Sequence, residues 1–398
     1  MKNLRNDFPI YRNNTKLVYL DYAATTFMPD NVISAWHDFH SNIGVSINRG
    51  SGILSDKASE IYYNSKKELL NFFGASSKYD IAFTKNATEG LNLMANTISN
   101  FLNAGDYILM SPYEHHSNII PWNEIAKLKE ASIIQFPILD DGSLDYNFIY
   151  NIDYKRIKII SLSLISNVTG YLLDLHTIKD IAKLTNAYTI LDISQACGHI
   201  KLNFDAIDAD AFVMSAHKMY GPKNIGACFI KKDLIDILPP FLLGGGMVWN
   251  TIGGNIQWHS GARKFDAGTF DIGLIYAWSK ACIYLNDIDM KNIQSFEEDL
   301  FDYTKDKFND LSDILDIIPY VNKSSIFSFD IHSIHTHDIA EILSKNNIEI
   351  RTGHMCSQNT LNIFNKTSLC RISWGIGSFH SDIDKLVEII KKETKRYE

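Results

Sequence analysis

Short apolar runs alternate with amphipathic helical stretches over most of this chain, from about residue 21 to about residue 286. The clearest runs of strand type are residues 81–84, 107–110, 157–164, 188–192 and 211–214. This alternation predicts parallel strands, because a helix usually carries the chain back across the sheet before the next parallel strand begins. The chain is therefore expected to be an α/β protein with a mainly parallel sheet covered by helices.

The pattern changes in the last third of the chain. Residues 297–311, 337–345 and 382–396 have helical periodicity, and residues 324–330 are typical of a strand. The chain has 398 residues, which is enough for two domains, because single hydrophobic cores stop growing near roughly 250–300 residues. The C-terminal part is therefore expected to form a smaller α+β domain.

The composition argues against several classes of protein. A net charge of -8 gives no electrostatic basis for binding nucleic acid or an anionic membrane. The N-terminus lacks the apolar segment of a signal peptide, and no apolar run approaches the length of a membrane span. Small molecules and proteins are the expected partners.

The cysteines point to a cytoplasmic protein. They are odd in number and scattered, without the spacing of a zinc site, so we expect reduced thiols and no metal: Cys197, Cys228, Cys282, Cys356 and Cys370.

Lys218 and Asp192 are the first candidate site residues. Asp192 ends one apolar run of strand type, and Lys218 closely follows the next. Neighbouring parallel strands bring their carboxyl ends to one crevice, where ligands bind in open α/β folds. A lysine that forms a Schiff base and an acid that keeps a pyridine nitrogen protonated are what pyridoxal phosphate requires. For either residue alone, a solvated loop position is the simpler interpretation.

Two further segments contain candidate ligands of such a cofactor. Ala87 and Thr88 open a helical stretch after a strand, and a helix N-terminus with a hydroxyl can hold a phosphate. A plain capped helix start is the alternative. His115 precedes a second histidine, His116, and one imidazole could lie flat on a cofactor ring. A surface histidine pair is the alternative there.

The C-terminal part has a cysteine in a basic setting. Cys356 lies close to Arg351 and His354, and a nearby cation favours the nucleophilic thiolate. Composition alone favours an inert, buried thiol. Arg371 could bind a substrate carboxylate through two hydrogen bonds, and an exposed salt bridge is the alternative.

Together these motifs resemble those of one family, the cysteine desulfurases of the SufS and CsdA type. These enzymes are the second class of NifS-like proteins, within the class V aminotransferase group of fold-type I pyridoxal phosphate enzymes. The matching segments follow the family's order along nearly the whole chain: residues 19–24, 87–90, 114–122, 166–170, 192 with 194–196, 215–222, 265–269 and 351–358.

The resemblance implies a fold and a set of cofactor ligands. The large domain, at residues 21–286, would hold a mainly parallel seven-stranded sheet, and residues 1–20 and 287–398 would form the small α+β domain. Lys218 would bind the cofactor covalently, and three side chains would contact its ring: Asp192 at the pyridinium nitrogen, Gln195 at the phenolic oxygen and His115 stacked on the face. The phosphate would be held by the following residues: Ala87, Thr88, Ser215 and His217.

The resemblance also implies partners and a reaction. Thr269 would reach the phosphate of a neighbouring subunit, which implies a homodimer. Arg371 and Asn167, with Arg351, would bind the substrate L-cysteine. Lys218 would remove the Cα proton and Cys356 would attack the substrate sulfur, which leaves a persulfide on Cys356 and releases alanine. An acceptor protein of the SufE or SufU type would then take the sulfur for iron-sulfur cluster or other sulfur-cofactor assembly.

The chain departs from the family pattern in two places. The family usually reads Arg-x-Gly-His-His-Cys-Ala, whereas here Met355 replaces the second histidine and Ser357 replaces alanine. The family also has histidines at the positions of Asn48 and Gly52. These departures concern the cysteine loop and the acceptor side more than the cofactor site.

Two other functions are compatible with these residues. A selenocysteine lyase or a specialised C-S lyase would use the same cofactor site without needing Cys356. A catalytically silent assembly partner is the third hypothesis, and the intact Lys218, Asp192, His115 and Arg371 argue against it.

Overall fold

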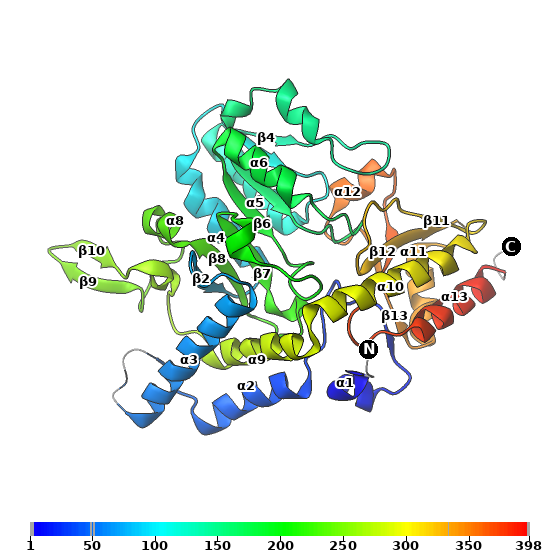
Figure 1. The fold of residues 1–398 in the computed structure, drawn as a ribbon, viewed down its shortest axis with the longest axis horizontal. Helices are drawn as coiled ribbons and strands as arrows, with labels where there is room; N and C mark the ends of the chain where they lie inside the picture. Colours follow the sequence, from blue (N-terminus) through cyan, green and yellow to red (C-terminus); the bar gives the residue numbers. More distant parts are fainter. Residues whose placement is uncertain (1–3, 48–49, 51, 333, 396–398) are drawn as a thin grey trace.

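The computed structural model describes residues 4–47, 50, 52–332 and 334–395. Asn48 lies outside these ranges, as do residues 49 and 51, whereas Gly52, the other position of that departure, is exposed and directly precedes helix α3 (Ile53–Phe72). Within the described residues a seven-stranded sheet forms the centre, in the order β2-β8-β7-β6-β5-β3-β4 (Figure 1). Its strands are β2 (Tyr79–Thr84), β3 (Tyr107–Met110), β4 (Ser132–Gln135), β5 (Ile157–Ser163), β6 (Tyr188–Asp192), β7 (Ala211–Ser215) and β8 (Gly226–Lys231).

The direction of these strands confirms the predicted mainly parallel sheet. β4, β3, β5, β6 and β7 run parallel to one another, and β8 is antiparallel to both of its neighbours, β7 and β2. The two strands that the sequence analysis did not identify within this sheet are β4 and β8. β4 is short and only partly buried, which weakens its apolar signal.

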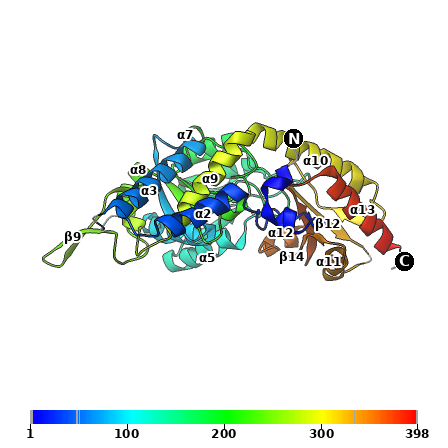
Figure 2. The same cartoon turned by 90° about the horizontal axis from the view of Figure 1, so that it is seen from below.

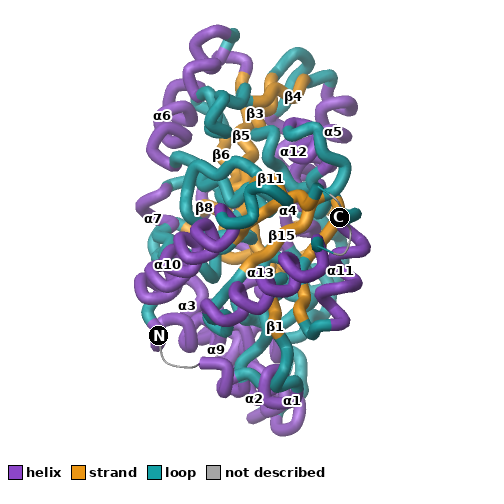
Figure 3. The backbone as a smooth tube through the Cα atoms, turned by 90° about the vertical axis from the view of Figure 1, so that its right-hand side faces the viewer, coloured by secondary structure: helices purple, strands orange, loops and turns teal. Residues whose placement is uncertain are grey.

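Alternate residues of each strand pack into two different hydrophobic cores. In β7, for example, Phe212 and Met214 belong to one core, and Ala211 and Val213 belong to the other. A strand that is buried on both faces has a continuous run of apolar residues, which is why most strands of this sheet could be predicted from the sequence. Figure 3 shows strands β3, β5 and β6 between α6 on one side and α5 on the other.

Helices cover both faces of the sheet. One face packs against α4 (Ala87–Ile98), α5 (His116–Lys129) and α8 (Lys232–Ile237). The other packs against α2 (Asp30–Asn42), α3 (Ile53–Phe72), α6 (Leu175–Thr185), α7 (Phe204–Ile207) and α9 (Ile272–Ile288), with α1 (Pro9–Asn13) at its margin.

Side-chain caps fix where several of these helices begin. The Asn86 side chain accepts a hydrogen bond from the Glu89 N–H at the start of α4, and Asp174 accepts from two N–H groups at the start of α6. Asn186 ends α6 in the left-handed conformation. Asparagine and aspartate are favoured at helix starts because their short side chains accept from free backbone N–H groups, and asparagine is favoured at helix ends because it tolerates the left-handed conformation.

The C-terminal part forms a second, antiparallel sheet of four strands within the described residues, in the order β11-β12-β15-β14. The strands are β11 (Leu315–Ile317), β12 (Ile326–Ile331), β14 (Arg351–Gly353) and β15 (Leu369–Ser373). The helices here are α10 (Met290–Asn309), α11 (Thr336–Lys345), α12 (Gln358–Ile363) and α13 (His380–Thr394), of which α10, α11 and α13 share a hydrophobic core with the sheet.

The N-terminal segment joins this second core. β1 (Val18–Tyr19) pairs in parallel with β13 (Ile348–Glu349), and Val18 and Leu20 are buried with the small sheet. The helix predicted at residues 297–311 begins seven residues earlier, at Met290, where the Asp289 side chain caps the new helix. The exact division at residues 21–286 stays a prediction.

The chain between α8 and α9 forms a separate two-stranded hairpin, made of β9 (Val248–Ile252) and β10 (Asn255–Trp258). Figure 2 shows it at the opposite end of the molecule from α13. Of the helices that the structure describes, none is long and apolar enough to cross a membrane.

We predict that Gly90→Ala destabilises the protein, although alanine usually stabilises a helix interior by about 1 kcal/mol over glycine. A Cβ atom at Gly90 would lie 2.7 Å from Val213 Cγ1 and 2.9 Å from Cys228 Sγ. Overpacking of this kind costs about 1–3 kcal/mol. Chemical denaturation should show this loss, whereas Asn96→Ala, on the exposed face of the same helix, should change the stability by less than about 0.5 kcal/mol. A more stable Gly90→Ala variant would contradict the prediction.

Candidate active site

A cavity of about 340 Å³ lies where the carboxyl ends of β5, β6 and β7 meet the second sheet. Twelve of the thirteen site residues predicted from the sequence line it: Ala87, Thr88, His115, Asn167, Asp192, Gln195, Ser215, His217, Lys218, Arg351, Cys356 and Arg371. The parallel strand arrangement explains why segments far apart in the sequence meet here.

Asp192 ends β6, Lys218 ends the short 3-10 turn that follows the adjacent strand β7, and both line the same cavity. Removal from water lowers the pKa of Lys218 below its usual range, and the nearby Arg371 guanidinium acts in the same direction. The Asp192 carboxylate opposes this shift. Asp192 is itself held in place, because its Oδ1 accepts a hydrogen bond of 2.9 Å from the Ser194 N–H. A lysine in this setting is more readily deprotonated than one in water.

His115 caps helix α5 through its ring. Its Nδ1 accepts a hydrogen bond of 3.1 Å from the Ser117 N–H, which leaves Nε2 as the protonated nitrogen of the neutral ring. Burial, together with the positive charge of Lys218, lowers the pKa of His115 to about 3. The imidazole is therefore neutral at physiological pH, as expected for a ring that lies against a planar group.

The N-terminus of α4 also lines the cavity. The Ala87 N–H donates to the Ser215 hydroxyl at 2.7 Å, and the Thr88 and Ser117 hydroxyls are 2.7 Å apart. His217 Nδ1 lies 3.1 Å from the Thr25 hydroxyl. Hydroxyl groups around a helix N-terminus provide the donors that a phosphate needs.

The donor set of the cavity fits pyridoxal phosphate. A deprotonatable lysine, a fixed carboxylate, a neutral imidazole and a helix N-terminus with hydroxyls all line it. The Ser194 hydroxyl, buried in this cavity, has no hydrogen-bond partner among the described residues. The described residues contain no cluster of three or more histidine, cysteine or acidic side chains that could hold a metal ion.

Arg371 is buried beside the cavity and is only partly satisfied. Its Nη2 donates to Asp21 at 3.0 Å and its Nη1 donates to the Asn167 carbonyl at 2.8 Å. Its Nε has no partner among the described residues. Asn167 uses its Nδ2 to donate to the Met355 carbonyl at 2.8 Å, and its buried Oδ1 has no partner among the described residues.

The Cys356 loop is held against α5 and the large sheet. The His116 N–H donates to the Cys356 carbonyl at 2.7 Å, and His354 Nδ1 accepts from the Cys356 N–H at 3.2 Å. Met355 and Cys356 both have positive φ, 51° and 54°, a conformation that costs energy for residues with side chains. The loop thus leaves the Cys356 side chain exposed at the mouth of the cavity.

Met355 has a packing role. It is buried in a small apolar cluster with Val168, Leu361 and Leu369. Its side chain therefore anchors the strained loop. The rings of His354 and His116 stack beside this loop, with their centroids 6.0 Å apart.

Cys356 differs from the other cysteines of the chain. All five are described by the structure, and Cys356 alone is exposed. Burial raises the pKa of Cys197 to about 12, and it also raises the pKa of Cys228, Cys282 and Cys370. Such thiols are poor nucleophiles.

Glu114 is a residue whose role the sequence analysis missed, although the segment 114–122 was singled out. Its buried carboxylate accepts hydrogen bonds from the Ser163 N–H and hydroxyl and from Asn118. Its backbone carbonyl accepts from the Ser357 hydroxyl at 2.9 Å. Glu114 therefore connects the end of β5, the start of α5 and the Cys356 loop.

Thr269 is the predicted site residue that the structure places elsewhere. It lines a separate cavity of about 230 Å³ with Gly245, Gly246, Arg263 and Asp266. Within one chain it therefore does not join the residues around Lys218.

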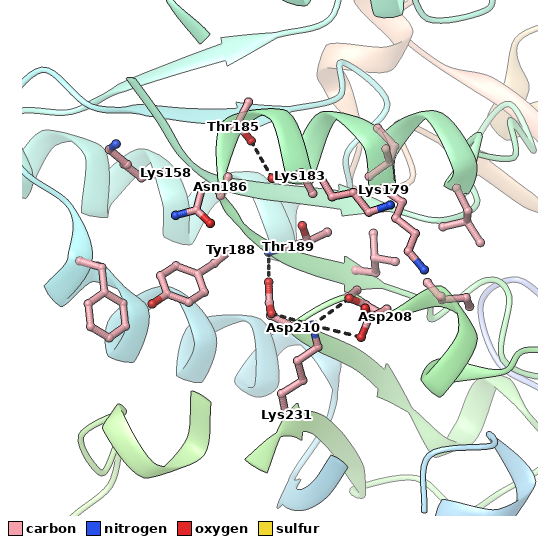
Figure 4. A pocket seen from close by; sticks show the side chains of 18 residues that line it. Lys158, Lys179, Lys183, Thr185, Asn186, Tyr188, Thr189, Asp208, Asp210 and Lys231 are labelled. Atoms are coloured by element: carbon pink, nitrogen blue, oxygen red, sulfur yellow. Dashed lines mark hydrogen bonds and ion pairs between the residues drawn. The ribbon is translucent and has the colours of Figure 1, made fainter. Parts of the chain in front are cut away.

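A third cavity, of about 500 Å³, lies at the amino ends of β6 and β7 and contains none of the predicted residues (Figure 4). Lys231 is held there between Asp208 and Asp210, at 3.3 and 3.1 Å.

Comparison with known proteins agrees with this geometry. The sequence model of the family "Aminotransferase class-V" matches residues 18–386. A cysteine desulfurase of Wigglesworthia glossinidia brevipalpis is 34% identical over 99% of this chain and 98% of its own length.

Two solved structures are similar over nearly the whole chain. The apo cysteine desulfurase of Thermococcus onnurineus has a TM-score of 0.94 and is 26% identical, with 99% of this chain and 98% of that chain covered. The cysteine desulfurase CsdA of Escherichia coli has a TM-score of 0.90, with the same identity and coverage.

We predict that Glu114→Gln removes a pH dependence of stability. Burial raises the pKa of Glu114 from 4.5 to about 7. At a pH between these two values, the Glu114 carboxyl therefore binds a proton more tightly in the folded protein than in the unfolded chain. Wild-type stability is then lost as the pH rises through this window. From about pH 5 to about pH 8 the variant should gain up to roughly 3 kcal/mol relative to wild type in urea denaturation. A stability difference that does not change with pH would contradict the prediction.

Proposed function

Because the chain belongs to the class V aminotransferase family and, within it, to the class II cysteine desulfurases, we propose that it converts L-cysteine to L-alanine and holds the sulfur as a persulfide on Cys356. The observation that carries this proposal is that the one exposed thiol of the chain lines the same cavity as Lys218, Asp192 and Arg371. A nucleophile is needed at the mouth of the cavity, because the sulfur must afterwards leave the protein.

The cofactor would be pyridoxal 5'-phosphate, which when bound supplies an electron sink for the charge left at the substrate Cα. Lys218 would hold it covalently and Asp192 would keep its ring nitrogen protonated. His115 would lie on the ring face, and Gln195 would contact the phenolic oxygen. The phosphate would be held by the start of α4, Ala87 and Thr88, together with Ser215 and His217.

Lys218 and Arg371 have distinct tasks in this mechanism. Lys218 would remove the substrate Cα proton, and its lowered pKa favours the neutral amine that a base requires. Arg371 would bind the substrate carboxylate through its guanidinium, which lines the cavity. Asn167 would hold Arg371 through its carbonyl and hold the Cys356 loop through its amide, which orients the two groups relative to each other.

Cys356 would attack the substrate sulfur as a thiolate. A sulfur-sulfur bond then forms, the bond between the substrate Cβ and sulfur breaks, and the substrate carbon skeleton leaves as alanine after protonation. Arg351 lines the cavity together with Cys356, and its cation would favour the thiolate.

The assembly would be a homodimer in which Thr269 of one protomer contacts the cofactor phosphate of its partner. The separation of Thr269 from the Lys218 cavity within one chain supports this proposal. The persulfide sulfur would pass to an acceptor protein of the SufE or SufU type, for iron-sulfur cluster or other sulfur-cofactor assembly in the cytoplasm.

We expect Cys356→Ala to remain yellow and to lose alanine and sulfide release from L-cysteine with reductant present, by at least roughly a hundredfold, because nucleophilic attack has no substitute thiol nearby. Cys282→Ala, which removes a buried thiol in α9, is the matched control and should keep the activity. L-Selenocysteine should be assayed alongside.

Full L-cysteine activity in Cys356→Ala would overturn the persulfide mechanism in favour of a direct C-S lyase. Loss of activity on L-cysteine with retention on L-selenocysteine would support the persulfide mechanism, because selenium can leave without a protein nucleophile.

The dimer proposal predicts that Thr269→Ala weakens cofactor retention without changing the mass of the assembly. Sedimentation should give twice the chain mass for both proteins, and the variant should lose its yellow colour faster on dialysis. A monomeric wild type would contradict the proposal.

A further inference from the structure

Two of the residues in which the chain departs from the family pattern lie on either side of the exposed thiol. Met355 precedes Cys356 and packs in an apolar cluster, whereas Ser357 follows it and is 0% exposed. A buried hydroxyl is costly unless it has a hydrogen-bond partner. The partners of Ser357 therefore indicate what this serine contributes to the loop.

The Ser357 hydroxyl connects the Cys356 loop to the segment that precedes α5. It donates to the Glu114 carbonyl at 2.9 Å and lies 2.8 Å from the Thr360 hydroxyl, which is itself 3.3 Å from the Pro112 carbonyl. Ser357 and Thr360 are both fully buried. Two hydroxyls from the C-terminal part of the chain thus meet the backbone directly before His115.

Glu114 is a fixed point of attachment for this contact. Its buried carboxylate accepts from the Ser163 hydroxyl at 2.6 Å, from the Ser163 N–H at 3.0 Å and from the Asn118 amide at 2.8 Å. Ser163 ends β5 and Asn118 lies in α5. A group whose own position is fixed by several hydrogen bonds can orient a neighbour that binds to it. Through Ser357 the loop is therefore fixed to β5 and α5.

The backbone of the loop requires such contacts. Met355 and Cys356 both have positive φ, a conformation that persists in residues with side chains only where the surroundings hold it. The Asn167 amide holds the Met355 carbonyl, and the His116 N–H holds the Cys356 carbonyl. Ser357 adds a third contact on the C-terminal side of the thiol. Alanine, the residue of the family pattern at this position, could not make it.

We propose that Ser357 is a positioning residue, whose hydroxyl holds the Cys356 loop on the Glu114 carbonyl so that the thiol faces the cavity. This inference rests on the proposed function, in which Cys356 attacks the substrate sulfur. Ser357 is fully buried and is absent from the described residues that line the cavity, so it acts on the reaction only through Cys356.

A contribution to the stability of the fold alone is the competing explanation. In that case the Ser357→Ala variant, once folded, would react as the wild type does. A positioning role instead slows the step that depends on where the thiol lies and leaves substrate binding unchanged. A rate measured on the folded protein therefore separates the two roles.

The experiment is a single turnover of the cofactor-loaded enzyme with L-cysteine and no reductant, in which mass spectrometry follows the persulfide on Cys356. Ser357→Ala should form the persulfide roughly tenfold more slowly, because a buried hydrogen bond that holds the reactive geometry is lost. The L-cysteine concentration that gives half of the maximal rate should stay within about twofold of the wild-type value. Ser357→Thr keeps the hydroxyl and should form the persulfide faster than Ser357→Ala does.

Two controls separate position from stability and from thiol reactivity. Ser279→Ala removes a buried serine hydroxyl that donates to the Tyr276 carbonyl in α9, and it should react as the wild type does. Alkylation of Cys356 by iodoacetamide without substrate should be at least as fast in Ser357→Ala as in wild type, because the hydroxyl binds the Glu114 carbonyl rather than the thiol.

A wild-type rate of persulfide formation in Ser357→Ala would overturn the proposal. A parallel loss of alkylation would also overturn it, because the hydroxyl would then affect the reactivity of the thiol rather than its position. If the wild type forms no persulfide, the proposed function fails, and hydrogen exchange still tests the loop contact. The amides of residues 354–358 should exchange faster in Ser357→Ala than in wild type, and equal exchange would contradict the positioning role.

Discussion

Buried polar contacts between the two sheets hold the two halves of the site in one cavity. Lys218 and Asp192 come from strand ends of the large sheet, whereas Arg371 and Cys356 come from the small sheet and its loop. Arg371 donates to the Asn167 carbonyl, and the Ser328 hydroxyl donates to the Val168 carbonyl at 2.6 Å. Buried polar groups are costly when unpaired, so these contacts oppose any displacement of the small sheet from the large one.

The same burial sets the chemical state of the groups in the cavity. Desolvation penalises the charged form of a side chain, which lowers the pKa of Lys218 and of His115 and raises that of Glu114. The imidazole of His115 is therefore neutral at physiological pH, and the Lys218 amine is easier to deprotonate than one in water. The cysteines show the contrast, because the four buried thiols are held protonated while Cys356 lies at the open mouth.

The structure also explains why the loop tolerates a departure from the family pattern. The position of the second histidine is taken by Met355, which packs among apolar side chains. The positive φ angles of Met355 and Cys356 require the loop to be fixed on both sides, and the contacts of His116 and Asn167 provide this. Packing and hydrogen bonding thus hold a conformation that the local sequence disfavours.

The sequence by itself determined the parallel sheet and most of the residues around the cavity. Strands buried on both faces give continuous apolar runs, and motif residues at their carboxyl ends, such as Asp192 and Lys218, must converge in a parallel sheet. Only the tertiary structure decided three other features, because each depends on partners far away in the sequence. These are the bridging of Arg351 and Arg371 by Asp21, the burial of Glu114 behind the Cys356 loop, and the location of Thr269 outside the cavity. Hydrogen bonding and desolvation depend on distances in space. A pattern along the chain therefore identifies the residue types but not which side chains contact one another.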